Sequence, residues 1–327
     1  MPINANDTIP PGLTRVPGLA VGQAQDLSLR TGVTVIVPDA PATAAVQILG
    51  GGPATRECDA LGLDRLVGQV DAVVLAGGSV YGLAAADAVT QILATKGRGV
   101  RLRDGVRPAP IVPAAAIYDL AAGGQAWSES PYASLAHQAM DNLGSDLAEG
   151  TVGAGTGATA GAYAGGVGTL AAEVETTAGV FSVGALVVCN SFGAVMAPDG
   201  RAPVQHRAFA ESVSDWGAAK ALPAPGVART NTTLVCVATH APLSRGQCSR
   251  VAQMASAGLA RSLRPVFTPF DGDVVFVLST APAEVPPCDL ADVTRLGAVA
   301  ADLVAEAVVR SVLYAQGCGQ APRWRPK

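Results

Sequence analysis

Short apolar runs and longer amphipathic stretches alternate along this chain. Several short runs carry β-branched residues and end at Gly, Pro or Asp, as buried strands do; they cover 33–37, 45–49, 72–76, 183–188, 234–238 and 274–278. Three longer stretches repeat apolar residues at helical spacing and predict helices over about 79–93, 244–264 and 289–315. The last third therefore alternates strand and helix, which predicts an α/β fold with helices packed on a sheet.

Composition and charge narrow the class of protein. The 327 residues are 49% hydrophobic and 15% charged, which is enough for a large core in a single domain over 1–327. A net charge of -4 argues against a nucleic-acid partner, because phosphate binding needs clustered Lys and Arg. We find neither an 18-residue apolar run nor a signal-peptide pattern, and we expect a cytoplasmic protein with no membrane contact. The six cysteines form no C-x-x-C pair, so we expect no metal and no other cofactor.

Two glycine-rich segments are candidates for the wall of a site. The glycines between 153 and 161 could suggest a dinucleotide loop, but the preceding residues form a poor strand and later glycines oppose a helix. We therefore expect an ordered loop over 150–168, with Gly155 lining a pocket. The second segment contains Gly78 and Ser79 and resembles a nucleophile elbow that lacks its last glycine. We interpret Ser79 as a helix cap and expect this turn to offer backbone N–H groups to an oxyanion.

A pair of threonines opens the apolar run at 234–238. Thr232 and Thr233 directly follow a Pro/Ala-rich stretch within about 198–231, which has the composition of a flexible connector. By itself this pattern is typical of a strand opening. Cleavage of the Asn231–Thr232 bond would instead place an amine and a hydroxyl on one residue, which is a known way to activate threonine. Asp271 and Asp273, ahead of the next apolar run, form either a polar turn or a carboxylate pair that could hold an ammonium.

The ordered set of motifs resembles one family. The motifs are Gly50-Gly-Gly-Pro-Ala-Thr-Arg-Glu57, Leu75-Ala-Gly-Gly-Ser-Val-Tyr-Gly-Leu83, Ala109-Pro-Ile-Val-Pro-Ala-Ala-Ala-Ile-Tyr-Asp119, Val152-Gly-Ala-Gly-Thr-Gly157, Val187-Val-Cys-Asn190, Asn231-Thr-Thr233 and Asp271-Gly-Asp273. Over about 12–317 the chain resembles the DmpA-type L-aminopeptidase/D-esterase family, which includes β-peptidyl aminopeptidases and nylon-oligomer hydrolases. The resemblance implies a four-layer αββα sandwich of the type shared with ornithine acetyltransferase. It also implies one chain that cuts itself into subunits 1–231 and 232–327.

The resemblance further implies roles for particular residues. Thr232 would be the nucleophile of an N-terminal-threonine amidohydrolase, with Asp271 and Asp273 as the acid pair. Asn190 would bind the nucleophile region or the oxyanion, and Tyr118 would line the site. The implied substrates are small amino-terminated molecules, short peptides or oligoamides, with hydrolysis at an amide or ester bond. The implied assembly is a homo-oligomer, with a tetramer favoured.

One position departs from the family pattern. The nylon-oligomer branch has a catalytic lysine after the glycine-rich loop, where this chain has Ala162. The loss of that cation keeps a second hypothesis open, in which the chain is a cleavage-impaired, non-catalytic homologue that acts as a binding or structural oligomer. A third hypothesis is an acyltransferase of the ornithine-acetyltransferase type.

Overall fold

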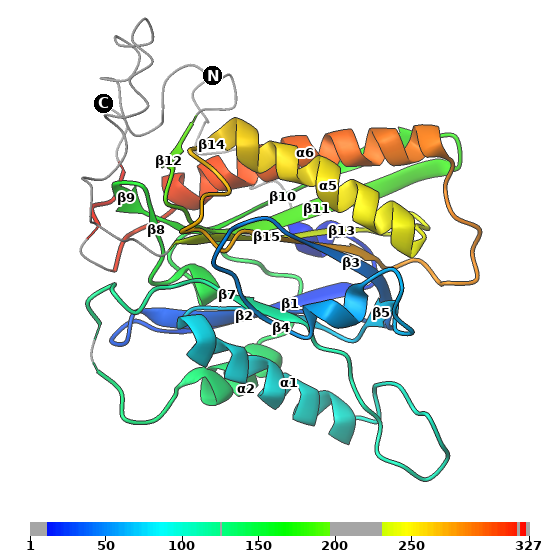
Figure 1. The fold of residues 1–327 in the computed structure, drawn as a ribbon, viewed down its shortest axis with the longest axis horizontal. Coiled ribbons are helices and arrows are strands. Elements are labelled where there is room, and N and C mark those ends of the chain that lie inside the picture. The colour runs from blue at the N-terminus through cyan, green and yellow to red at the C-terminus, as the bar shows by residue number, and fades with distance from the viewer. Residues whose placement is uncertain (1–11, 125, 197–230, 319–320, 325–327) are drawn as a thin grey trace, which may run out of the picture.

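Two stacked β-sheets with helices on both outer faces form the molecule (Figure 1). The computed structural model describes residues 12–124, 126–196, 231–318 and 321–324. Three buried clusters fill the spaces between the four layers: one between a sheet and α5/α6, one between the two sheets, and one between the other sheet and α1/α2. The expected four-layer αββα sandwich is confirmed.

The six-stranded sheet has the order β10-β11-β13-β15-β3-β5. Its strands are β10 Gly166–Thr176, β11 Gly179–Asn190, β13 Thr232–Thr239, β15 Val274–Ser279, β3 Ala42–Ile48 and β5 Gln69–Val70. β13 lies antiparallel to β11 and parallel to β15. The two central strands β13 and β15 are buried along their whole length, which explains why they appear in the sequence as continuous apolar runs.

The five-stranded sheet has the order β1-β2-β6-β7-β4. Its strands are β1 Leu19–Asp26, β2 Thr31–Pro38, β6 Val73–Ala76, β7 Ala114–Ala116 and β4 Ala54–Arg56. Two small pairs lie beside the sheets: β8 Thr159–Ala160 with β9 Tyr163–Ala164, and β12 Ala194–Val195 with β14 Leu263–Arg264. The part of the chain that the structure describes also has four 3₁₀ turns: η1 Leu13–Arg15, η2 Cys58–Leu61, η3 Ser79–Leu83 and η4 Gly153–Gly155.

Among the described residues, the helices are α1 Ala84–Thr95 and α2 Tyr132–Asp141 on one side, and α5 Arg245–Ser262 and α6 Leu290–Leu313 on the other (Figure 1). α5 begins at a capping box, in which Ser244 Oγ accepts the Gln247 N–H and the Gln247 side chain accepts the Ser244 N–H. The predicted helices over 244–264 and 289–315 are confirmed. None of the helices in the described ranges is long and apolar enough to cross a membrane.

The sequence pattern is right about the core strands and wrong at two places. All six predicted strands are present, as β2, β3, β6, β11, β13 and β15. The interpretation of Ser79 as a helix cap is wrong, because Ser79 has a left-handed φ of 54° and opens a 3₁₀ turn that receives no side-chain cap. The apolar pattern also misses β10, whose glycines admit α6: a Cβ on Gly168 would lie 1.9 Å from the Ala307 carbonyl oxygen. The connector expected at about 198–231 lies almost wholly outside the described residues.

Candidate active site

Thr232 is the first residue of β13 and pairs across the sheet with Asn190, the last residue of β11. Along β13, Leu234 belongs to the core between the two sheets, whereas Val235 belongs to the core under α5 and α6. Because side chains alternate along a strand, Thr232 is on the same face as Leu234, toward the space between the sheets. Thr232 is only 3% exposed. Its hydroxyl therefore sits at the edge of the inter-sheet core.

The Asn231–Thr232 peptide bond is held by contacts on both sides. The Thr232 hydroxyl donates to the carbonyl oxygen of Asn231. The Gly272 N–H donates to the same oxygen at 3.0 Å, and the Asn231 N–H donates to the Phe270 carbonyl at 3.1 Å. The carbonyl group is thus fixed between the hydroxyl of the next residue and a backbone donor. A donor in this position stabilises negative charge that develops on the oxygen.

Gly272 lies too close to the Thr232 hydroxyl for any side chain. A Cβ built there would be 2.9 Å from Thr232 Oγ1 and 2.8 Å from the Gly52 carbonyl oxygen. Only glycine allows this backbone to bring its N–H to the Asn231 carbonyl without displacing the hydroxyl.

Asp271 is a buried carboxylate that anchors two neighbouring segments. Its Oδ1 accepts the Phe192 N–H at 3.1 Å, and its Oδ2 accepts the Thr268 hydroxyl at 2.6 Å. The backbone of Asp271 also forms a parallel bridge with Asn231. Asp271 therefore connects three segments: the residues after β11 and the loop before β15 through its carboxylate, and Asn231 through its backbone.

Asp273 is the second buried carboxylate. Its Oδ1 accepts the Thr233 N–H at 2.6 Å, and its Oδ2 accepts the Phe267 N–H at 3.2 Å. Burial, followed by the negative charge of Asp271, raises the pKa of Asp273 to about 7. An ammonium formed on Thr232 would relieve the repulsion between the two carboxylates, because an opposite charge favours the ionised acid.

Asn190, at the end of β11, connects the six-stranded sheet to the segment that follows β7 of the other sheet. Its Oδ1 accepts the Thr159 N–H at 2.8 Å, and its Nδ2 donates to the Tyr118 carbonyl at 3.2 Å. Tyr118 follows β7 of the five-stranded sheet and is 36% exposed. The side-chain amide of Asn190 therefore joins the end of β11 to the segments that carry Thr159 and Tyr118.

Gly78 is linked to the Thr232 site by a hydrogen bond to Asp119, the residue after Tyr118. Asp119 follows Tyr118, is buried, and accepts the Gly78 N–H at 2.6 Å and the Thr31 hydroxyl at 2.8 Å. Burial raises the pKa of Asp119 to about 6. The Ser79 N–H donates to the Ile117 carbonyl, so both N–H groups of the expected oxyanion turn already have acceptors.

Gly155 and Ala162 occupy different positions along the glycine-rich segment. Gly155 packs against β10, where its Cβ would be 2.6 Å from the Val167 nitrogen, and its expected place in a pocket wall stays a prediction. Ala162 is exposed in the turn between β8 and β9. Two contacts fix this hairpin beside the site: Thr159 N–H to Asn190, and Gly161 N–H to the Ser191 carbonyl at 3.0 Å.

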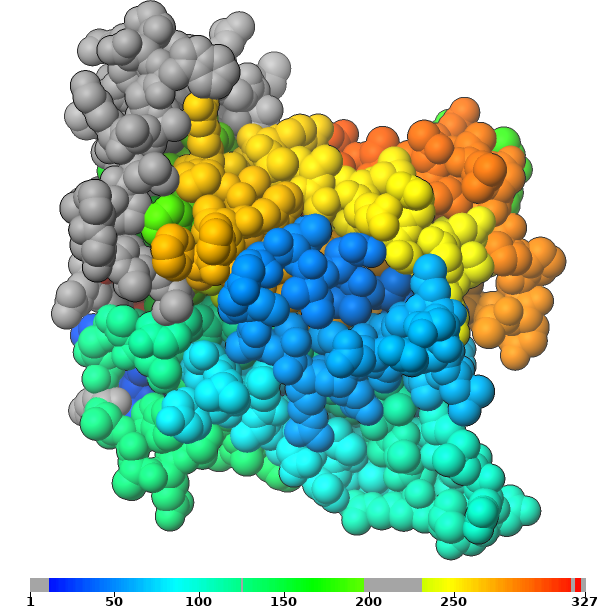
Figure 2. Space-filling view, in the orientation of Figure 1, coloured from blue at the N-terminus to red at the C-terminus, as the bar shows by residue number. Residues whose placement is uncertain are grey.

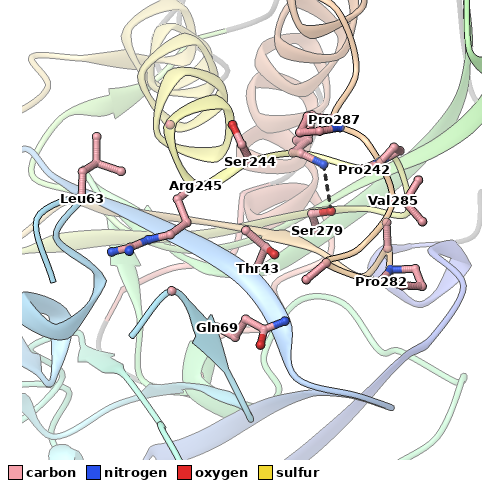
Figure 3. A pocket seen from close by; sticks show the side chains of 15 residues that line it. Thr43, Leu63, Gln69, Pro242, Ser244, Arg245, Ser279, Pro282, Val285 and Pro287 are labelled. Carbon is pink, nitrogen blue, oxygen red and sulfur yellow. Dashed lines mark hydrogen bonds between the residues drawn. The ribbon is translucent and has the colours of Figure 1, made fainter. Parts of the chain in front are cut away.

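A cavity of about 610 Å³ lies at the opposite end of the six-stranded sheet (Figure 3). Ser279 and Ser244 help to line it, and Ser279 pairs with Thr239 at the far end of β13. Thr239 lies seven residues beyond Thr232 along β13, at a rise of ~3.3 Å per residue. The Arg245 guanidinium at the cavity donates to the Arg65 carbonyl at 2.8 Å. This cavity is separate from the Thr232 site.

Three residues of the site were not singled out by the sequence pattern. They are Gly272, which donates to the Asn231 carbonyl, Thr159, which donates to Asn190, and Phe192, which donates to Asp271. Gly272 did carry a signal, since it lies between the two acids. Thr159 and Phe192 act through backbone N–H groups, which any residue type but proline would supply.

The raised pKa of Asp273 predicts the pH dependence of the stability of the uncut chain. The folded state keeps a proton that the unfolded carboxyl, with a pKa of about 4, has lost. Stability is therefore expected to fall as pH rises from about 4 to about 7. The measurement is urea unfolding of Thr232→Ala, with and without Asp273→Asn, at several pH values. Asp119, whose pKa is also raised, makes the free energy of unfolding fall with pH in the same direction, so the two variants must be compared. Asp273→Asn should make this fall with pH smaller. An equal fall in both variants would contradict the raised pKa of Asp273.

Two solved structures that share this architecture are aminopeptidases, and one of them is described as a variant of the Ntn-hydrolase fold. A β-aminopeptidase of Burkholderia sp. superposes with a TM-score of 0.74 at 26% identity, over 96% of this chain and 95% of that one. The L-aminopeptidase D-Ala-esterase/amidase of Ochrobactrum anthropi has a TM-score of 0.74 at 23% identity, over 94% of this chain and 88% of that one, and it shows the same fold.

The chain belongs to peptidase family S58, whose sequence model matches residues 12–321. An uncharacterized aminopeptidase of Mycobacterium tuberculosis is 42% identical over an alignment of 344 residues that covers 96% of each protein. A 6-aminohexanoate-oligomer endohydrolase of Kocuria sp. is 28% identical over 90% of this chain and 84% of that protein. The family and these relatives support aminopeptidase or amidohydrolase activity, and the resemblance to the DmpA-type family is confirmed.

Proposed function

We propose that this chain is a self-processing aminopeptidase or amidohydrolase whose nucleophile is Thr232 at the amino end of a 232–327 subunit. One observation carries the proposal: the Thr232 hydroxyl contacts the Asn231 carbonyl oxygen, and the Gly272 N–H donates to that oxygen as well. A hydroxyl, an electrophilic carbonyl and an oxyanion donor are the parts that acyl transfer needs.

Self-processing would begin when Thr232 Oγ1 attacks the carbonyl carbon of Asn231. The C–N bond breaks, an ester forms, and the hydroxyl proton ends on the Thr232 nitrogen, which becomes a free amine. The Gly272 N–H would stabilise the oxyanion in this step. Water then hydrolyses the ester, which releases the Asn231 carboxylate and restores the hydroxyl.

In the processed enzyme the same atoms would act on a substrate. The new amine of Thr232 takes the hydroxyl proton, and Oγ1 attacks an amide or ester carbonyl. Asp271 and Asp273 would hold and orient the ammonium, since they contact the residues on either side of Thr232. The names of the relatives point to amino-terminated substrates, either short peptides or aminohexanoate oligomers.

Denaturing mass spectrometry of the purified wild-type protein tests the proposal directly. Two fragments that correspond to 1–231 and 232–327 are expected, together with release of amine from an aminoacyl, β-aminoacyl or aminohexanoyl amide. An intact chain without amidase activity would favour the non-catalytic oligomer, and acyl transfer between amino acids without hydrolysis would favour an acyltransferase.

A lysine at position 162 is expected to speed self-processing. Ala162 is exposed in the β8–β9 turn, whose neighbouring residues contact Asn190 and Ser191, so a long side chain can extend from it toward the site. An ammonium there would stabilise developing negative charge, and we expect cleavage to be at least about tenfold faster, as for one electrostatic contact. The rate is followed by gel densitometry of fresh precursor. Ala162→Met is the control, because a methionine side chain is about as long as lysine but neutral. An equal gain in cleavage rate in both variants would show that the charge is not the cause.

A further inference from the structure

The backbones of two phenylalanines, Phe192 and Phe270, contact the chain on the acyl side of the Asn231–Thr232 bond. The carbonyl of Phe270 accepts the Asn231 N–H at 3.1 Å. The N–H of Phe192 donates to Asp271, which bridges to Asn231. The ring centroids of Phe192 and Phe270 lie 5.9 Å apart at an interplanar angle of 31°. The pair therefore connects the end of β11 to the loop before β15, next to the residue that precedes the cut.

This aromatic pair is open to solvent on one side. Phe270 is 47% exposed, which is unusual for a large apolar side chain in a fixed ring contact. The loop that carries it lies at the surface beside the turn at 49–53 (Figure 2), to which it is tied by the Gly51 N–H to Thr268 carbonyl bond at 3.1 Å. An exposed apolar surface beside a reacting bond is the usual position of a substrate subsite.

The side chain of Asn231 fits these surroundings poorly. Asn231 is 7% exposed, and its buried Oδ1 has no hydrogen-bond partner. A buried polar atom without a partner is destabilising, whereas an apolar side chain in the same place needs no donor. The position that Asn231 occupies is thus better matched to an apolar side chain than to its own amide.

The chemistry of the two reactions makes this position informative about substrates. In self-processing the acyl group that forms the ester on Thr232 ends in Asn231. In substrate hydrolysis the ester carries the acyl residue of the substrate on the same oxygen. Asn231 in the uncut chain therefore marks where the acyl residue of a substrate begins.

We propose, building on the proposed function, that Phe192 and Phe270 form the acyl-residue subsite and select substrates whose amino-terminal residue carries a large apolar side chain, aromatic side chains foremost. Aromatic residues contact one another through offset and edge geometries that a third ring can extend. The aromatic pair would then decide which amino acid is released, and Thr232 and the acid pair would carry out the reaction.

The experiment compares p-nitroanilides of phenylalanine and alanine, and of their β-homologues, on processed enzyme. The wild type is expected to favour the phenyl-bearing member of a pair by at least about tenfold in kcat/KM, within the range that apolar pockets reach. Phe270→Ala should lower kcat/KM for that member about tenfold and change the alanine member less than about twofold. For Phe270→Leu, kcat/KM for the phenyl-bearing member should lie between the values of the wild type and Phe270→Ala. Val180→Ala, at the other end of β11 and 56% exposed, is the control and should change neither.

Binding of the released amino acid gives a second readout that does not need turnover. Calorimetry on processed protein should show tighter binding of phenylalanine than of alanine, with the difference lost in Phe270→Ala. If Phe270→Ala is not processed, Phe192→Ala takes its place. A preference for alanine, or a preference unchanged in both variants, overturns the subsite. Selective phenylalanine binding without hydrolysis of any substrate would instead overturn the proposed activity and leave the subsite standing.

Discussion

Thr232→Ala is expected to remain a single uncut chain and to lose amidase activity by at least about 10³-fold. The substitution removes the one hydroxyl that contacts the Asn231 carbonyl, and without the cut no amine is formed to act as base. Loss of a nucleophile that acts together with its base costs activity of this order or more. Denaturing mass spectrometry reports the cut, and steady-state assay of an aminoacyl p-nitroanilide reports the activity.

Two further variants separate the hydroxyl chemistry from strand stability. Thr232→Ser keeps a hydroxyl and is expected to be cut. Thr233→Val keeps Thr232 and is expected to be cut at the wild-type rate. Thr233 is fully buried, and valine keeps its branched shape and the N–H that donates to Asp273. Cleavage of Thr232→Ala before residue 232 or before Thr233, or loss of cleavage in Thr233→Val alone, would show that the wrong residue has been assigned.

Gly272→Ala is expected to slow self-processing by about 10²–10³-fold, the range for loss of one oxyanion donor. A Cβ at this position would lie 2.9 Å from Thr232 Oγ1, so either the hydroxyl or the Gly272 N–H must move away from the Asn231 carbonyl. The measurement is the fraction of cut chain with time after purification. Circular dichroism and a thermal melt establish that the uncut protein is folded.

Gly246→Ala is the matched control for this glycine. A Cβ on Gly246 meets no atom within 4 Å, because the residue lies in the exposed first turn of α5. Its processing should match that of wild type. A folded Gly272→Ala chain that cuts at the wild-type rate would show that the backbone N–H of residue 272 has no part in the reaction.

The sequence pattern succeeds where one periodicity dominates. The buried runs that became β13 and β15 and the stripe that became α6 follow from residue type, since most of their buried side chains are apolar. It fails where close approach between distant segments decides the structure. Ser79 has a left-handed φ in a turn whose N–H groups at 78 and 79 donate to Asp119 and Ile117, just after β7. In β10, the glycines leave room for α6 to pack closely.

The same division applies to the site. The sequence by itself determined that a threonine opens a buried strand. It also determined that two acids flank a glycine just before a second buried strand. Only the tertiary structure decided that Gly272 donates to the Asn231 carbonyl and that Asn190 pairs with Thr232. It also decided that the backbones of Phe270 and Phe192 contact Asn231 and Asp271. Local propensity depends on near neighbours in the chain. These contacts depend on the parallel pairing of β13 with β15 and its antiparallel pairing with β11, which a one-residue change of register would undo.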